Sequence, residues 1–315
     1  DIMKKIFLPV LVFLVLLVQV TYANSKNTNN IVEKYKILAN SGEIDAMFSL
    51  GIIYSTGDGV IQDYKEAFKW FFMAANKDDI ISQYNLAILY KDGLGVEKNQ
   101  QEAYRNFLKS ANKGYKEAAY MVGLALEKGD GVDKNLNQAF SWFLKAAKAG
   151  QNQSEYKVAK MYRQGEGVAK NNTEAFNWYK ISAEKGNALS QANLGLMYKL
   201  GVATQKNYGE ALKWFEKAAN QKNVIGQLNL ASMYQAGLGT QKNLKEAFKI
   251  YQEAANEGNN ANAQFNTGLM YLKGEGVEKD SSKTFEYWTK SSEQGYEVAT
   301  NNLKILCKEI PQVCK

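Results

Sequence analysis

A glycine recurs along this chain every 36 residues, and this period constrains the fold more than any other feature of the sequence. The series runs through Gly57, Gly93, Gly129, Gly165, Gly201 and Gly237, and it continues at Gly274 after one inserted residue near Asn259 and Asn260. Periods of about 20 to 50 residues are typical of stacked supersecondary units. The sequence therefore predicts a repeat protein, in which each unit packs against its neighbours along the chain.

Two helices are expected in each repeat, one on either side of the glycine. Six residues after each glycine stands Asn or Asp, and three residues further on stands Glu or Gln, except for Lys283 in the last repeat. This is the spacing of a capping box: the Asn or Asp side chain accepts first-turn N–H groups, and the Glu or Gln side chain accepts the N–H of the cap itself. The caps that begin the second helix, termed helix B, are Asp63, Asn99, Asn135, Asn171, Asn207, Asn243 and Asp280.

Helix B carries aromatic residues followed by a small pair, such as Trp70 and Phe71 before Ala74 and Ala75. Glycine tolerates a left-handed backbone, and it is expected to end B helices at positions 114, 150, 186, 258 and 295. The first helix, termed helix A, has apolar and small residues at helical spacing before the glycine turn. Neither helix can bury its apolar face alone, so the pairs must stack. We predict an all-α fold, a right-handed α-solenoid of stacked helix-turn-helix repeats with a concave surface.

The N-terminal segment has the pattern of a signal peptide. Lys4 and Lys5 precede an apolar run, and Ala23 ends a small-x-small cleavage site, so residues 1–23 are expected to be removed. An uncleaved membrane helix is the alternative, but the apolar run is shorter than the about 18 residues that this needs. We expect a disordered linker at 24–30, an N-terminal capping half-repeat at 31–42, seven repeats at 43–295, and a C-terminal capping helix and tail at 296–315. The mature chain would be periplasmic or secreted.

Cys307 and Cys314 are the only cysteines, and six residues separate them near the C-terminus. In an oxidising compartment such a pair is expected to form a disulfide. Pro311 lies between the two cysteines and is expected to stop the last helix. A redox-active thiol pair is the alternative interpretation, but the C-x-x-C spacing that favours it is missing.

The repeat pattern A-x-x-x-N-L-G-x-M-Y-x-x-G-x-G-V-x-K-N-x-x-E-A-x-x-W-[FY] resembles the Sel1-like repeat family, relatives of tetratricopeptide repeats. The best single match joins Ala192 to Tyr198 with Glu210 to Phe215. The resemblance implies an adaptor or scaffold, and it implies that exported bacterial members engage envelope enzymes or host surfaces. The pattern is interrupted at a few positions, where the family residue is replaced by Leu126, Ala203, Thr240 and Lys283.

A peptide-binding groove follows from the relation to tetratricopeptide repeats, whose residues beside the helix A glycine face the concave side. The corresponding residues here are Tyr84, Asn85, Tyr120, Tyr156, Lys157, Lys160, Asn193, Lys199, Asn229, Phe265 and Asn266. Asparagine and lysine could hold a peptide backbone or carboxylate, and tyrosine supplies apolar area with a polar tip. The structural alternative is that asparagine bonds to neighbouring backbone and tyrosine packs between repeats. The expected partner is a protein or peptide, either an envelope enzyme or a host protein.

Catalysis is not expected, because the chain contains no histidine, which excludes Ser-His-Asp, Cys-His and histidine-ligated zinc sites. A cell-wall-directed or β-lactam hydrolase is the alternative function. Three S-x-x-K motifs start at Ser110, Ser154 and Ser182, but no S-D-N or K-T-G motif accompanies them. No cofactor or metal is predicted. The formal net charge of +7 is a mild lysine excess, and export argues against nucleic acid as a partner and against membrane insertion once the signal is cleaved.

Overall fold

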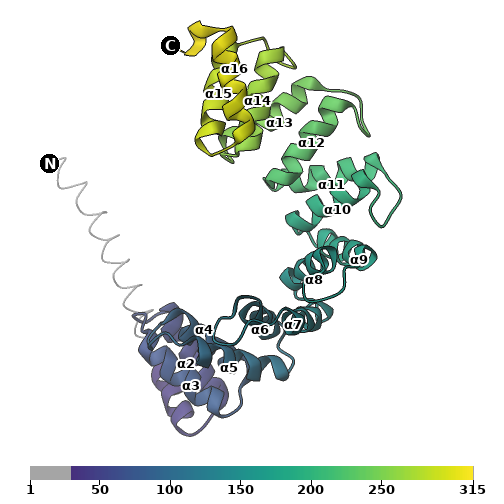
Figure 1. The fold of residues 1–315 in the computed structure, drawn as a ribbon. Coiled ribbons are helices and arrows are strands. Elements are labelled where there is room, and N and C mark those ends of the chain that lie inside the picture. The colour runs from purple at the N-terminus through teal and green to yellow at the C-terminus, as the bar shows by residue number, and fades with distance from the viewer. Residues whose placement is uncertain (1–29, 315) are drawn as a thin grey trace, which may run out of the picture. The chain divides into compact units, whose positions relative to one another are not determined.

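The computed structural model describes residues 30–314, and all regular structure in this part of the chain is helical (Figure 1). A helical segment covers residues 30–40, and helices then alternate between A and B. The A helices are α2 (Ile44–Thr56), α4 (Ile80–Asp92), α6 (Lys116–Lys128), α8 (Asn152–Gln164), α10 (Ala188–Leu200), α12 (Val224–Ala236) and α14 (Ala261–Lys273). The B helices are α3 (Tyr64–Asn76), α5 (Gln100–Asn112), α7 (Leu136–Lys148), α9 (Asn172–Glu184), α11 (Tyr208–Asn220), α13 (Leu244–Asn256) and α15 (Ser281–Glu293). The predicted all-α fold of stacked helix-turn-helix repeats is confirmed, while the predicted signal peptide lies outside the described residues.

The chain forms two compact units that divide after Gln151. In unit 1, each helix from α2 to α7 packs against the next one along the chain, and in unit 2 the helices from α8 to α16 do the same. The core of each unit is therefore a series of small apolar clusters along the stack. One cluster in unit 2, for example, joins Tyr179 of α9 to Leu194 of α10 and Trp214 of α11.

Close approach of helices A and B depends on a small residue in the middle of helix A. A Cβ atom added at Gly51 would lie 2.5 Å from the ring of Phe71, and one added at Gly195 would lie 2.8 Å from the ring of Phe215. The aromatic ring of helix B thus rests directly on the backbone of helix A. This contact is repeated in the last pair, where Gly268 meets Trp288.

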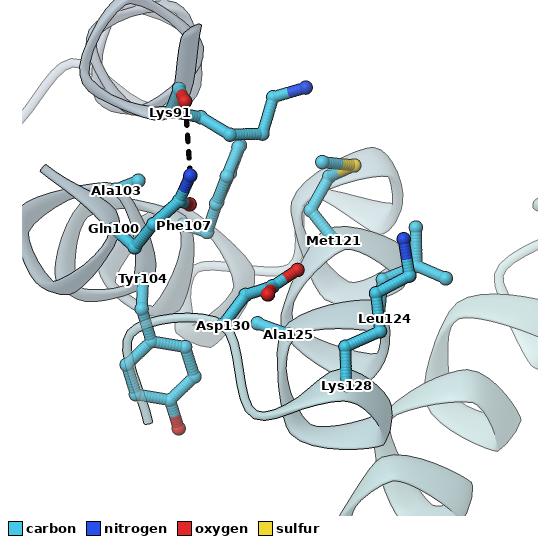
Figure 2. Close-up of a pocket in the computed structure, with 10 residues that line it drawn as sticks. All are labelled: Lys91, Gln100, Ala103, Tyr104, Phe107, Met121, Leu124, Ala125, Lys128 and Asp130. Atoms are coloured by element: carbon cyan, nitrogen blue, oxygen red, sulfur yellow. Dashed lines mark hydrogen bonds between the residues drawn. The ribbon is translucent and has the colours of Figure 1, made fainter. Parts of the chain in front are cut away.

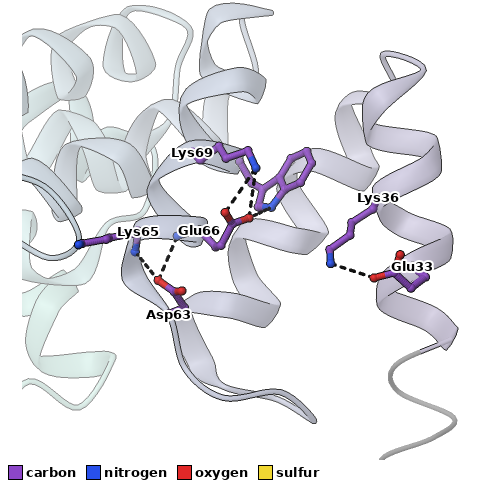
Figure 3. A network of polar contacts seen from close by, with 7 residues as sticks. Glu33, Lys36, Asp63, Lys65, Glu66 and Lys69 are labelled. Atoms are coloured by element: carbon purple, nitrogen blue, oxygen red, sulfur yellow. Dashed lines mark hydrogen bonds and ion pairs between the residues drawn. The ribbon is translucent and has the colours of Figure 1, made fainter.

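The B-helix caps accept the first-turn N–H groups as predicted, but the reciprocal half of the expected capping box is wrong. Asp63 Oδ1 accepts from the N–H groups of the second and third helical residues, at 2.9 and 3.2 Å (Figure 3). The N–H of Asp63 donates to the carbonyl of Tyr54, at 2.9 Å, and the other B-helix caps donate to the matching carbonyl of their own A helix. Glu66 instead accepts from the indole N–H of Trp70, at 3.0 Å, and pairs with Lys69. The cap therefore ties helix B to helix A across the turn.

The glycines expected to end B helices behave alike with one exception. Gly114, Gly150, Gly186 and Gly295 have positive φ, between 80° and 95°. Gly258 does not, and the left-handed backbone falls instead on Asn259, at φ 42°. The reason is the inserted residue, which lengthens this connection by one position and moves the turn.

The second turn glycine of a repeat sits against the start of the preceding B helix. A Cβ atom at Gly95 would lie 2.1 Å from the carbonyl oxygen of Tyr64, and one at Gly131 would lie 2.1 Å from that of Gln100. Ala203 replaces this glycine in one repeat and still adopts the left-handed backbone, at φ 59°. This conformation costs a residue with a Cβ atom about 1–2 kcal/mol.

Replacement of Ala203 by glycine is expected to raise the free energy of unfolding by up to about 1 kcal/mol, because the relief of backbone strain exceeds the entropy that glycine adds to the unfolded chain. Urea unfolding followed by circular dichroism measures the change. Ala169 lies in another turn and is not among the residues with positive φ, so Ala169→Gly is the matched control and is expected to destabilise. Equal effects of the two substitutions would contradict the assignment of strain to Ala203.

The described part of the chain ends with α16 (Glu297–Glu309) and the short 3₁₀ helix η1 (Pro311–Cys314). The last helix ends at Glu309, two residues before Pro311, which was expected to stop it. Cys307 and Cys314 form a disulfide, with their Cα atoms 5.6 Å apart. The disulfide fastens η1 to the last turns of α16, and Pro311 opens the turn between them.

Candidate functional site

The residues expected to line a binding groove all lie on A helices, and the structure brings three of them into one pocket. Tyr156, Lys160 and Asn193 line a pocket of about 270 Å³ in unit 2. Its other lining residues, which the sequence analysis missed, are Arg163, Gln164, Tyr179, Leu189 and Ile225. The pocket lies between α8, α10 and α12, with Tyr179 contributed by α9, and we call it the unit 2 pocket.

The other expected groove residues do not line this pocket. Lys199 and Asn229 are one repeat further along the A helices, where Lys199 Nζ donates to Asn229 Oδ1 at 3.2 Å. Lys157 shares α8 with the pocket residues but is not part of its lining. The remaining residues lie either in unit 1 or on α14, namely Tyr84, Asn85, Tyr120, Phe265 and Asn266.

The aromatic members of the expected groove pack within their own repeats. Tyr156 contacts the ring of Tyr179 at a centroid distance of 6.1 Å, and Phe265 stacks on Trp288 at 5.5 Å. Tyr84 and Tyr120 make similar contacts with the B-helix phenylalanines of their repeats. All four rings are half-buried, so each has a packing role and also retains an exposed edge.

The asparagines at the sixth position of helix A each make the same type of hydrogen bond. In each of them Nδ2 donates to the backbone carbonyl four residues earlier, at 2.7 to 3.0 Å, and these residues are Asn85, Asn193, Asn229 and Asn266. The structural alternative is therefore correct for the amide nitrogen. The amide oxygen remains available, and in two repeats it accepts from a cation, because Arg163 Nη1 donates to Asn193 and Lys199 Nζ donates to Asn229.

A sequence signal for these pairs exists, although it becomes visible only with the repeat register in hand. A cation stands at the twelfth position of helix A, and an asparagine stands 30 residues later at the sixth position of the next A helix. Arg163 with Asn193 and Lys199 with Asn229 fit this spacing. The pairs therefore connect α8 to α10 and α10 to α12 along a single face of unit 2.

Positive charge dominates the unit 2 pocket. Lys160 and Arg163 line it together with tyrosine, amide and apolar side chains, and no acidic residue is part of the lining. Lys160 has no hydrogen bond or ion pair to any residue of the described part of the chain. Burial raises the pKa of the Tyr179 phenol to about 12, and the nearby Arg163 opposes part of this shift. Burial lowers the pKa of Lys199, so this charge is also poorly solvated.

The serines of two S-x-x-K motifs are packing residues. Ser110 is fully buried and donates to the carbonyl of Ile80 at 2.8 Å. Ser182 is equally buried and accepts from Ser190 Oγ at 2.7 Å. The lysine of the first motif, Lys113, pairs with Asp78 of the preceding repeat. The lysine of the other motif, Lys185, pairs with Glu155, so both motif lysines are paired with an acid.

Residues 30–314 contain neither a group of acidic and cysteine side chains placed to hold a metal ion nor a helix long and apolar enough to cross a membrane.

Seven consecutive segments of the chain match the family model of the Sel1 repeat: residues 44–79, 80–115, 116–151, 152–187, 188–223, 224–259 and 261–296. The chain belongs to the Sel1 repeat family. Sel1 repeats generally mediate protein–protein interaction, so the family points to a scaffold and not to a reaction. No curated protein matches this Sel1 repeat chain by sequence.

Two solved structures of Sel1 repeat proteins are similar to the present one. The first is a protective antigen present in uropathogenic Escherichia coli strains, which is 33% identical at a TM-score of 0.83 over 88% of this chain. The match covers 59% of the E. coli chain, so the present Sel1 repeat protein spans only that part of its relative. The second is a Sel1 repeat protein from Oxalobacter formigenes, 28% identical at a TM-score of 0.72, with 90% of this chain and 81% of that chain covered.

Proposed function

We propose that this Sel1 repeat protein is an exported bacterial scaffold that binds an acidic segment of a protein partner, in the envelope or at a host surface, through the unit 2 pocket. The observation that carries the proposal is the uncompensated positive charge of the pocket. Lys160 and Arg163 line the pocket, and no acidic residue does. Lys199 has the same position in α10 that Arg163 has in α8. A carboxylate from a partner would supply the missing negative charge.

The neighbouring side chains are suited to recognition of such a carboxylate. Asn193 holds Arg163 through a neutral amide oxygen, which fixes the guanidinium without cancelling its charge. Hydrogen bonds from such a cation to a carboxylate are about twice as strong as those between neutral groups. The half-buried ring of Tyr156 and the apolar side chains of Leu189 and Ile225 offer contact area beside the charged group.

Three observations support export. The pattern around Lys4, Lys5 and Ala23 is that of a signal peptide. The disulfide between Cys307 and Cys314 is of a kind that persists mainly in oxidising compartments. The E. coli relative is a protective antigen, and a protein that acts as an antigen is one that the host immune system meets. These observations support the proposal that the mature chain acts in the periplasm or outside the cell.

Neutralising the pocket is expected to weaken partner binding at least about 10-fold, which corresponds to the loss of one charge-assisted contact. The variant is Lys160→Gln/Arg163→Gln, immobilised beside the unchanged protein and exposed to envelope and host-cell extracts. Captured proteins are identified by mass spectrometry, purified, and titrated at several salt concentrations to obtain Kd. Binding is expected to weaken as salt rises, because charges at the rim are screened.

Lys245→Gln/Lys249→Gln is the matched control, since both lysines are exposed on α13 of the same unit and the change in net charge is the same. It is expected to leave Kd unchanged. Equal weakening by both pairs would reduce the interaction to general charge attraction and would refute the pocket. No observation favours the hydrolase alternative: the serines of all three S-x-x-K motifs, Ser110, Ser154 and Ser182, are buried. The hydroxyls of Ser110 and Ser182 are also hydrogen-bonded to other groups.

A further inference from the structure

One repeat lacks a side chain that its sister repeats share. The tenth residue of helix A is large and apolar in six repeats, and these residues are Ile53, Leu89, Met161, Met197, Met233 and Met270. In α6 the same position is Ala125. The replacement removes most of a leucine or methionine side chain from the contact between α6 and the preceding B helix.

The sister repeats show where the missing side chain would lie. Leu89 belongs to one apolar cluster with Ala67 and Phe71 of the preceding B helix. Met233 packs in the same way with Ala211 and Phe215. The tenth residue of helix A therefore fills a space between the fourth and eighth residues of the B helix before it.

A pocket of about 140 Å³ occupies this space in unit 1. Ala103 and Phe107, the fourth and eighth residues of α5, line it opposite Ala125 of α6. Figure 2 shows the α5 residues on one side, the α6 residues on the other and Asp130 between them. The volume is close to that of an engineered leucine-to-alanine cavity, about 150 Å³, which has room for benzene.

The helices cannot slide together to close this pocket, because the adjoining turn is fixed. Gly131 sits against the backbone of Gln100 so closely that a Cβ atom would lie 2.1 Å from its carbonyl oxygen. Gln100 Nε2 also donates to the carbonyl of Lys91, at 3.1 Å, which joins α5 to α4 at the rim. The pocket is thus held open by contacts that do not involve Ala125.

We infer that the pocket at Ala125 is a socket for a single methionine or leucine side chain of a bound protein. The chain itself supplies the template, since a leucine or methionine packs with the fourth and eighth residues of the preceding B helix in four other repeats, at Leu89, Met197, Met233 and Met270. The walls are apolar at Met121 and Leu124, while Lys128 and Asp130 form a polar rim that the flanking backbone of a partner can meet. The inference rests on the proposed scaffold function but concerns a different unit and a different kind of contact.

Filling the socket from within tests the inference. Ala125→Met restores the side chain of the sister repeats, and Ala149→Met adds the same side chain at an exposed position of unit 1 as the control. The probe is a library of random 12-residue peptides displayed on phage, selected on the unchanged full chain. Selected peptides are synthesised, and their Kd values are measured by fluorescence anisotropy.

The expected result is that the selected peptides share one methionine or leucine, and that Ala125→Met weakens them at least about 10-fold while Ala149→Met does not. Alanine in place of the shared peptide residue is expected to weaken binding to the unchanged protein by the same factor. It is expected to leave the Kd for the Ala125→Met protein unchanged, because both changes remove the same contact. Thermal unfolding of Ala125→Met is expected at or above the original temperature, since a cavity is filled.

Several results would overturn the socket: unchanged affinity for Ala125→Met, selected peptides without an apolar anchor, no selected peptide at all, or a lower unfolding temperature for Ala125→Met. A change of oligomeric state in Ala125→Met would also overturn it, by making a second copy of the chain the occupant. The socket and the proposed function can fail independently of each other. If Lys160→Gln/Arg163→Gln abolishes partner capture while Ala125→Met leaves peptide binding intact, the scaffold proposal stands and the socket does not.

Discussion

Replacing Lys185 with alanine is expected to lower the free energy of unfolding by about 3 kcal/mol, because it leaves a buried carboxylate without its counter-charge. Glu155 is only 1% exposed and forms an ion pair with Lys185, whose side chain is 41% exposed. The second carboxylate oxygen, Oε2, has no hydrogen-bond partner in the described part of the chain. The exposure of the lysine places the expected loss at the lower end of the range for broken buried pairs. Guanidinium unfolding followed by circular dichroism measures it.

The repeats themselves provide the control for this prediction. At the positions of Glu155 and Lys185, two other repeats have glutamine pairs: Gln221 Nε2 donates to Gln191 Oε1 at 2.8 Å, and Gln294 Nε2 donates to Gln264 Oε1 at 2.7 Å. Glu155→Gln/Lys185→Gln is therefore expected to unfold within about 1 kcal/mol of the original protein or to exceed its stability. A double variant as unstable as Lys185→Ala would show that packing, not charge, determines the loss.

Truncating Phe215 to alanine is expected to cost about 4 kcal/mol of unfolding free energy. The ring is fully buried, and it lies so close to the backbone of Gly195 that a Cβ atom at this position would collide with it. It also belongs to the apolar cluster of Leu230 and Met233 in the next A helix. Its loss would therefore open a cavity shared by two repeats. Denaturant unfolding gives the change from the shift in midpoint.

Phe72→Ala is the matched control, because Phe72 is an aromatic residue of helix B that is 42% exposed and contacts Phe68 at a centroid distance of 5.9 Å. Its loss is expected to cost less than about 1.5 kcal/mol, since a large part of its surface is already in water and its removal leaves no enclosed cavity. Similar losses for Phe72→Ala and Phe215→Ala would mean that the helix pairs are not held together by the ring on the helix A backbone.

Both candidate binding features arise where repeats differ from one another. The unit 2 pocket depends on cations at the ninth and twelfth positions of α8, and the unit 1 socket depends on one alanine in α6. The regular positions are occupied by packing and capping, so a repeat that follows the pattern has few side chains left for a partner. Function in this chain is therefore to be sought at the exceptions to the pattern.

The repeat period, the helical pairs and the start of every B helix could be predicted from the sequence, because these depend on residues close together in the chain. A cap such as Asn207 accepts from the N–H three residues later, and a turn glycine such as Gly93 acts on its own φ. Each local signal is repeated every 36 residues, so the pattern can be recognised from the sequence alone.

The partners of groups on different helices could be seen only in three dimensions. The N–H of Asp63 bonds to Tyr54 instead of Glu66, Arg163 reaches Asn193, and the space beside Ala125 stays open. Each outcome depends on how closely neighbouring helices approach and on the volume of the side chains between them. Those quantities are set by packing between residues about 9 to 30 positions apart, and local propensity does not encode them.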